Sequence, residues 1–413
     1  MFKKIKQIGR RLAVVGSIIG PGIIAANADN DAGGITTYSV VGAEFGFKML
    51  WVLFLLTFAL AITQEMGARI GLVTRQGLGG VIRENFGVKL TVFAMVAMLI
   101  ANIGTTTAEF AGVAAAFSLF GISKYIVVPL VALVVWIVLY KGSFKTTQKL
   151  FLIFSLLYVV YIVNGLIIGP DFHAAFQAMI RPSLEWNPRY LVTVIALIGT
   201  TITPWGQFFI QSYVVDKGID IKHYKTAKKE VYFGAVLTNI VSFFIIVSTA
   251  ATLYKFGIHV TDAREAAEAL RPLAGDLAEL LFAAGLFAAS MLGAFILPVA
   301  TAYALCEAFG WEAGFDTTWK TGKVFYSIIL LMIVVPSLVV LIPGVSLVKM
   351  MIISQDVNGI LLPFILIFVM KIVNNKRVMG EYTNKPIGNA IAWITIGALV
   401  VLSLALVVTS FLD

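Results

Sequence analysis

Cysteine, histidine and charge are all scarce in this chain of 413 residues. It has one cysteine, Cys306, and three histidines, and charged residues make up only 13% of the chain. A lone cysteine excludes a disulfide framework and a cysteine-based metal site. The histidines fall in predicted loops, so the HExxH spacing of a zinc protease is absent. Nothing in the sequence supports an enzyme, and we expect no cofactor.

Hydrophobic residues are abundant instead and form 59% of the chain. A soluble domain is about half apolar and about a quarter charged. The sequence therefore predicts an all-α polytopic membrane protein, a single membrane domain over residues 1–413. We attribute the net charge of +9 to Lys and Arg in cytoplasmic loops and not to nucleic-acid binding. The lipid bilayer is an expected partner. The oligomeric state stays open, and a monomer is compatible with the sequence.

Membrane-spanning helices need about 20 mostly apolar residues, and eleven such segments are predicted. They cover roughly residues 12–45, 49–72, 90–120, 123–141, 149–169, 189–215, 230–255, 275–307, 323–343, 347–373 and 386–411. Most Lys and Arg residues of the loops lie on the side of the N-terminus. This bias predicts a cytoplasmic N-terminus and an outer C-terminus in a cell (plasma) membrane. The periodicity of residues 262–276 predicts an additional helix in an outer loop.

Two of the predicted spans are interrupted at corresponding positions. Helix 1 breaks at Asp31–Gly34 and helix 6 breaks at Thr203–Gly206. The breaks are five helices apart, which is typical of a LeuT-type 5+5 inverted repeat with its substrate site at the broken helices. The first repeat would cover about residues 12–170 and the second about 189–373, and helix 11, at about 386–411, would follow.

The break in helix 1 lies within ANADNDAGGITT, residues 26–37. An acidic residue at membrane depth is costly, so Asp31 is a candidate for cation binding. Asp29, two residues earlier, would either line the ion path or cap the broken helix.

Several motifs resemble the NRAMP divalent-metal transporters. GPG at 20–22 followed by DAGG at 31–34 is similar to the family's GPG and metal-binding DPGN in helix 1. The similarity extends through AEFGFKMLW (43–51), QEMGARIGLVT (64–74), TTTAEFAG (105–112) and SQDVNGILLPF (354–364). It spans nearly the whole chain and implies an importer of divalent metal ions that works by alternating access.

The resemblance also implies a set of metal-site residues. Asp31 stands at the family's metal-binding Asp, and Gly34 replaces its Asn ligand. Thr200 would offer a backbone carbonyl as the family's Ala does, and Thr203 replaces the family's Met. Gln355 matches a Gln of the family, although a Gln between helices can also serve only for packing.

These replacements leave a site of oxygen atoms only, because the thioether that favours softer metals is gone. Mg²⁺ prefers oxygen ligands and usually keeps several waters. Gly34 in place of Asn is expected to open volume for a partly hydrated ion. Polar residues nearby would hold its water shell or line its path: Asn27, Asp29, Gln207, Asp356 and Asn358. The pattern is closest to the NRAMP-related magnesium transporters, and Mn²⁺ is a second expected substrate.

Proton coupling is expected to be absent. The family's proton route has fewer ionisable residues here, since Trp205 replaces a His and Thr106 replaces an Asp, while Glu109 is kept. Trp205 is expected to be a packing wall. A divalent ion gains about 4.6 kcal/mol per 100 mV, which can drive uptake without protons.

Alternatives remain for several residues and for the function. Asp356 would have a structural role if it paired with Lys349. Glu109 would have a structural role if it held helices together. Thr203 would have one if its hydroxyl only satisfied a carbonyl freed by the break. Glu65 is expected to be structural beside Arg69. The runner-up function is a proton-coupled Mn²⁺/Fe²⁺ importer. A LeuT-fold transporter of an organic solute ranks lower, because the acidic break would repel a substrate carboxylate.

Overall fold

The computed structural model describes residues 21–142, 144–258, 263–315 and 317–410, which form helices and connecting turns without a β-strand. The α-helices are α2 (Pro21–Ala28), α3 (Ala32–Phe45), α4 (Leu50–Thr74), α5 (Leu78–Ser118), α6 (Lys124–Lys141), α7 (Phe144–Leu157), α8 (Val159–Ile168), α9 (Phe172–Ile180), α10 (Pro188–Thr201), α11 (Pro204–Asp216), α12 (Tyr224–Thr252), α13 (Ala263–Phe309), α14 (Lys323–Leu341), α15 (Leu347–Val373), α16 (Lys376–Met379) and α17 (Pro386–Ser410). Short 3₁₀ turns are η1 (Ile221–His223), η2 (Tyr254–Phe256) and η3 (Gly380–Tyr382).

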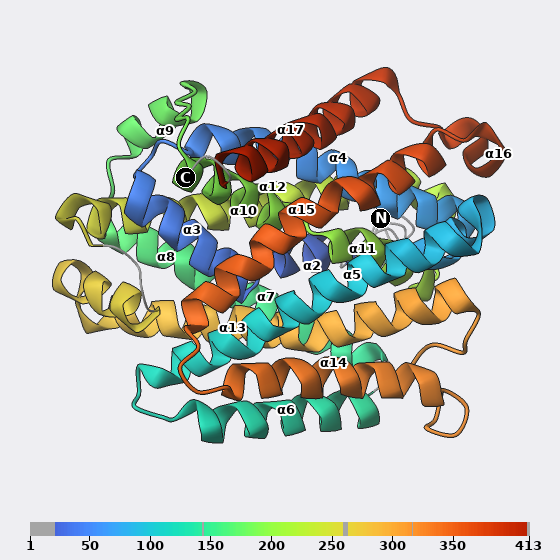
Figure 1. Ribbon diagram of the computed structural model, residues 1–413, viewed down its shortest axis with the longest axis horizontal. Coiled ribbons are helices and arrows are strands. Elements are labelled where there is room, and N and C mark those ends of the chain that lie inside the picture. The colour runs from blue at the N-terminus through green and yellow to red at the C-terminus, as the bar shows by residue number, and fades with distance from the viewer. Residues whose placement is uncertain (1–20, 143, 259–262, 316, 411–413) are drawn as a thin grey trace, which may run out of the picture.

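The helices of the bundle differ widely in how far they are buried. Within the described residues, ten helical segments are long and apolar enough to cross a membrane. The pair α2 and α3 adds the interrupted first span. The segment Pro188–Asp216, which contains α10 and α11, is 94% buried over its most apolar window, against 17% for Pro386–Leu404 in α17. Figure 1 accordingly shows α2 and α11 in the middle of the bundle, with α6 and α14 along one side and α17 on the opposite side.

Both helices are interrupted as predicted, although the breaks lie a little earlier in the chain: they cover residues 29–31, not Asp31–Gly34, and residues 202–203, not Thr203–Gly206. After each break the chain restarts as a helix with its own N-cap. Asp31 is extended (φ −68°, ψ −179°), and its side chain accepts a hydrogen bond from Gly34 N. Thr203 is extended (φ −85°, ψ 144°), and its side chain accepts one from Gly206 N. Pro204 stands at the first position of α11, where a missing N–H costs nothing. Two stretches of non-helical backbone are therefore stabilised by capping in the middle of the protein.

Glycines bring α10 and α15 into close contact beside the second break. A Cβ built on Gly199 would lie 2.3 Å from the backbone oxygen of Gln355, and one built on Gly359 would lie 2.6 Å from the backbone oxygen of Ile195. Such distances exclude any larger side chain, so the two backbones pack directly on each other. This packing fixes the position of Gln355 relative to the broken helices.

Other features of the helices also differ from the sequence prediction. The span expected at 149–169 is divided at Tyr158 into α7 and α8. Helix α5 begins at Leu78, not near 90, and bends at Gly87, whose φ of 74° lies in the left-handed region. The helix expected at 262–276 is not separate, because α13 begins at Ala263 and runs on without interruption. Helix α9 was not predicted; Asp171 caps it. The charged start of α5 and the nine-residue helix α9 are not apolar over a long enough run for a hydropathy criterion to find them.

Candidate functional site

Asp29 connects the two breaks directly. Its carboxylate is 1% exposed and lies between α2 and α3. Thr203 Oγ1 donates to Asp29 Oδ1 at 2.7 Å, and Gln64 Nε2 on α4 donates to Asp29 Oδ2 at 2.8 Å. Because Thr203 also caps α11, one hydroxyl ties the start of α11 to the end of α2. The cap of α3 is Asp31, so capping is not the role of Asp29 here.

Asp31 is held by its own helix and by α15. Its Oδ1 accepts from Gly34 N at 2.6 Å, and Gln355 Nε2 lies 3.1 Å from Oδ1 and 3.3 Å from Oδ2. Gly33 makes room for Gln355, since a Cβ at Gly33 would lie 2.0 Å from Gln355 Nε2. Asn358 Nδ2 donates to Gln355 Oε1 at 2.9 Å and so fixes the orientation of that amide. The predicted residues Asp31, Gln355 and Asn358 therefore form one chain of hydrogen bonds.

Three oxygen atoms converge on Gly34. A Cβ built there would lie 2.8 Å from Thr200 Oγ1, 3.1 Å from the carbonyl oxygen of Asp29 and 3.2 Å from Asp31 Oδ1. The expectation that Gly34 opens volume thus differs from the structure, in which Thr200 from α10 closes in on the glycine. Gly34 acts by letting oxygens from α10 and from both sides of the first break approach one another.

Thr200 has two oxygen atoms available for a ligand. Its hydroxyl is buried and has no hydrogen-bond partner within the described part of the chain. Its carbonyl lacks the usual helical donor four residues on, because that residue is Pro204, which has no N–H. The sequence predicted the carbonyl as a ligand, and the structure adds the hydroxyl beside Asp31.

Glu109 on α5 contacts the start of α3. Its Oε2 accepts from Ala32 N at 3.2 Å, where the positive end of the helix dipole favours a carboxylate. A Cβ on Gly293 of α13 would lie 2.3 Å from Glu109 Cδ, so that glycine makes room for the side chain. Its Oε1 has no partner among the described residues. Glu109 both supports α3 and leaves one oxygen free near Asp31.

The remaining predicted residues lie farther from this network or outside it. Gln207, on α11, is buried beside Gly67, and its Oε1 lacks a partner within the described ranges. Asp356 is half-buried and forms no ion pair with Lys349, and its Oδ1 is likewise without a hydrogen bond from the residues described. The side chain of Asn27 lies outside the described residues.

Sequence reasoning missed Gln64 and Asn30. Gln64 binds Asp29, and Asn30 is fixed by three bonds: its Nδ2 donates to the Thr238 carbonyl, Ser242 Oγ donates to its Oδ1, and Tyr158 Oη donates to its carbonyl. The available signal was their polarity within apolar spans. Trp205 is fully buried, as the packing role requires.

The candidate ligand atoms around Gly34 are all oxygens: one carboxylate oxygen of Asp31, the hydroxyl of Thr200 and the carbonyl of Asp29. In the described ranges, no three His, Cys, Asp or Glu side chains gather closely enough to hold a metal ion. Met351, one turn before Gln355 on α15, has its sulfur in a hydrogen bond from Thr36 Oγ1 at 3.3 Å. Neutral hydroxyl and carbonyl oxygens beside Asp31 are suited to a hard cation that keeps part of its water.

Comparison with known proteins assigns the family. A family model described as Nramp, natural resistance-associated macrophage protein-like, matches residues 22–409. The divalent metal cation transporter MntH of Bradyrhizobium diazoefficiens is 25% identical over 411 residues, which cover 96% of this chain and 90% of that protein. MntH of Yersinia pestis is 25% identical over 394 residues, 92% of this chain and 93% of that protein.

Solved structures show the same fold. The Eremococcus coleocola manganese transporter superposes with a TM-score of 0.77 at 20% identity and covers 95% of this chain and 86% of that one. MhsT in complex with L-phenylalanine gives a TM-score of 0.58 at 15% identity over 93% of this chain and 98% of that one. These likenesses confirm the LeuT-type fold. Together with the family match they establish that the chain is a multi-pass membrane transporter, not an enzyme, and that it belongs to the Nramp family.

Proposed function

We propose that this chain imports divalent cations, Mg²⁺ first and Mn²⁺ also, across the plasma membrane. The observation that carries the proposal is the convergence of Asp31 Oδ1, Thr200 Oγ1 and the Asp29 carbonyl oxygen around Gly34. All three are oxygen atoms, and hard cations take oxygen ligands. The relatives named as divalent metal cation and manganese transporters support the same class of substrate.

The transported ion keeps part of its hydration shell. One side-chain carboxylate at the centre cannot replace six waters, and Mg²⁺ dehydrates reluctantly. The neutral oxygens of Thr200 and the carboxylate of Asp29 then hold the ion partly through water. Gln207 and Asp356 each have a side-chain oxygen without a partner among the described residues, and these oxygens serve this purpose along the route.

Uptake proceeds by alternating access. Asp29, Asp31, Thr200 and Gln355 are all at most 1% exposed, so an ion reaches them only when the bundle opens. The two breaks give each half-helix a hinge at the site. The cytoplasmic N-terminus and outer C-terminus predicted from the loop charges complete the proposed topology.

Transport is driven by membrane potential alone in this proposal. A divalent cation gains about 4.6 kcal/mol per 100 mV on moving inward. Glu109 is the acidic group near Asp31 that could instead carry a proton, and it is engaged with the start of α3. Its free Oε1 keeps the proton-coupled Mn²⁺/Fe²⁺ importer as the second candidate.

The test is uptake into proteoliposomes with a pH dye inside and a potassium diffusion potential applied. Wild type is compared with Asp31→Ala and with Asp171→Ala. Asp171 is a matched control because it also caps a helix through its carboxylate but is exposed on the short helix α9. We expect Mg²⁺ and Mn²⁺ entry without acidification in wild type and Asp171→Ala, and none in Asp31→Ala. Mn²⁺ entry with acidification and no Mg²⁺ entry would establish the second candidate instead.

A further inference from the structure

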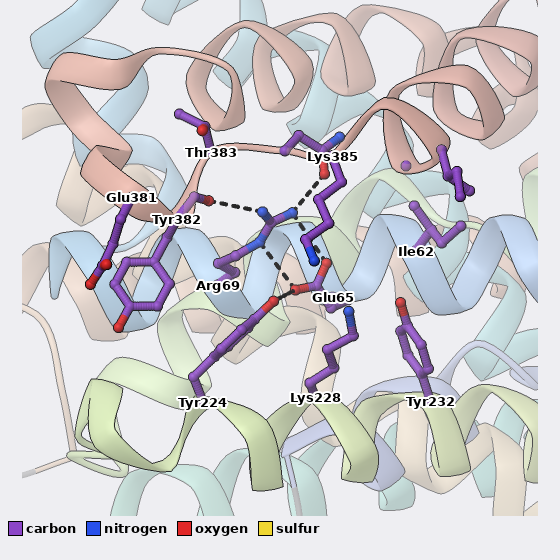
Figure 2. Close-up of a pocket in the computed structure, with 13 residues that line it drawn as sticks. Ile62, Glu65, Arg69, Tyr224, Lys228, Tyr232, Glu381, Tyr382, Thr383 and Lys385 are labelled. Atoms are coloured by element: carbon purple, nitrogen blue, oxygen red, sulfur yellow. Dashed lines mark hydrogen bonds and ion pairs between the residues drawn. The ribbon is translucent and has the colours of Figure 1, made fainter.

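A polar pocket lies at the end of the bundle where α4 ends and α12 and α17 begin. It has a volume of about 240 Å³, and its walls include Glu65, Arg69, Tyr224, Lys228, Tyr382 and Lys385 (Figure 2). It is separate from the site between the broken helices. Its end of the bundle carries the loops that the charge bias predicts to be cytoplasmic.

The floor of this polar pocket is an ion pair that is already satisfied. Arg69 Nε lies 3.1 Å from Glu65 Oε1, and a second guanidinium nitrogen donates to Glu65 Oε2 at 3.2 Å. Tyr224 Oη donates to Glu65 at 2.5 Å, and Arg69 also donates to the carbonyl of Tyr382 and to Asn384 Oδ1, each at 2.8 Å. The pair contributes no net charge and holds α4 against the segment before α17.

Two lysines leave the polar pocket positive. In Figure 2, Lys385 extends from the segment before α17 toward Glu65, and Lys228 rises from α12 toward the same region. Neither amine forms an ion pair or hydrogen bond with the residues described; Lys228 lies 5.1 Å from the ring of Tyr232. Glu381, the other acid in the wall, lies on the far side of Tyr382. The two amines therefore present an anion site above a neutral floor.

An apolar groove continues from the polar pocket along the seam between α4 and α17. It has a volume of about 620 Å³, and its walls include Leu55, Ala59, Ile391 and Ile394. Ile62 and Ile387 line the polar pocket, so on both helices the groove begins within about one turn of it. Charge at one end and an apolar channel at the other form an amphipathic site.

We propose that this site binds an anionic phospholipid, with its phosphate at Lys228 and Lys385 and an acyl chain in the groove. The dimensions agree with one leaflet. Glu65 and Leu55 are ten residues apart on α4, about 15 Å at 1.5 Å per residue, which is half of a hydrocarbon core of about 30 Å. Lysines at a membrane surface attract anionic headgroups. The bound lipid fastens α17 to α4 and α12.

The experiment measures thermal unfolding of the purified full-length protein, stripped of lipid in detergent, against added ligand. The probes are dioleoylphosphatidylglycerol, zwitterionic dioleoylphosphatidylcholine and water-soluble glycerol 3-phosphate. We expect only the phosphatidylglycerol to raise the melting temperature at micromolar concentration. Substituting both amines, Lys228→Gln with Lys385→Gln, should weaken its apparent affinity roughly 30-fold.

Two further variants are needed. One tests whether any pair of surface lysines has the same effect, and the other tests the apolar end of the site. Lys371→Gln with Lys376→Gln removes two exposed lysines near the same end, outside the polar pocket, and should change the affinity less than twofold. Gly397→Trp fills the apolar groove at a position where a Cβ meets no atom within 4 Å, and should weaken lipid binding without unfolding the helix.

Three results would overturn the proposal. Equal stabilisation by glycerol 3-phosphate, with Gly397→Trp unaffected, would assign the pocket to a soluble phosphate compound. Equal weakening by both lysine pairs would mean diffuse attraction to the surface. Unchanged phosphatidylglycerol binding in both the Lys228/Lys385 variant and Gly397→Trp would mean that the site does not bind lipid.

Discussion

Replacing Gly34 with alanine tests the convergence of oxygens at the first break. The new Cβ would lie 2.8 Å from Thr200 Oγ1, well inside an ordinary contact distance, with two more oxygens within 3.2 Å. Overpacking of this kind costs about 1–3 kcal/mol, and alanine regains about 0.5–1 kcal/mol of helix propensity, so we expect a net loss of about 1 kcal/mol. Displaced oxygens should lower Mg²⁺ affinity by about tenfold or more.

Thr200→Ala completes a double-mutant cycle with this change. Alone, it removes a buried hydroxyl that has no partner in the described structure, so stability should change little while Mg²⁺ affinity falls. In the double variant, the closest of the three contacts is gone, and part of the stability lost in Gly34→Ala should return.

The assays are thermal unfolding and isothermal titration with Mg²⁺ in detergent. Gly397→Ala is the matched control, since a Cβ there meets open space and should only favour the helix. A Gly34→Ala protein that melts and binds Mg²⁺ like wild type would refute the close approach of the oxygens.

Three further predictions concern other parts of the molecule. Thr203→Val removes the cap of α11 and the hydrogen-bond donor to Asp29, so the free energy of unfolding should fall by about 2 kcal/mol, measured as a lower melting temperature. An unchanged melting temperature would rule out the link between the breaks. Glu109→Gln keeps a hydrogen-bond acceptor for the start of α3, so stability and potential-driven uptake should persist. If wild type acidified the proteoliposome interior and Glu109→Gln did not, Glu109 would instead carry protons. The hydrogen bond between Lys48 and Glu185, at 2.6 Å, raises the pKa of Lys48 and lowers the pKa of Glu185. The Lys48–Glu185 pair therefore stabilises the folded protein fully between the unfolded Glu pKa of about 4.3 and the unfolded Lys pKa of about 10.4. This stabilisation is lost when the pH falls below that range and Glu185 is protonated, or rises above it and Lys48 is deprotonated. Limited proteolysis near Glu185 should accelerate at low pH in wild type, and Lys48→Gln should abolish the difference.

The breaks were predictable because their causes are visible in single residues. Gly33 and Gly34 after Asp31, and Pro204 after Thr203, interrupt apolar runs that otherwise read as spans. The structure shows both breaks, but slightly earlier than predicted: the non-helical backbone covers residues 29–31 and 202–203, and Gly33, Gly34 and Pro204 already lie in α3 and α11. Hydropathy likewise identified the spans themselves, because each needs its apolar length to cross a bilayer.

Contacts between distant helices were harder to predict. Gln64 was recognisable as a polar residue in a span, but nothing local indicates that it binds Asp29. The loss of a side chain at Gly34 was interpreted as space, whereas neighbouring helices approach a glycine until other atoms fill the gap. Which atoms lie next to Gly34 depends on the position and register of α10, and these are set by the packing of the whole bundle.

The wide sequence separation of the site's hydrogen bonds has a consequence for synthesis. Asp29 finds Gln64 35 residues later in the chain but meets Thr203 only 174 residues later, and Asp31 meets Gln355 after 324 residues. At about 5–20 residues per second, a ribosome needs roughly 10–35 s to reach Thr203 and about 15–65 s to reach Gln355. During that interval the first span carries its acidic residues without their final partners. A nascent chain truncated before α15 should therefore hold this span poorly in the membrane, and insertion of the first helix becomes secure only when the last part of the site has been made.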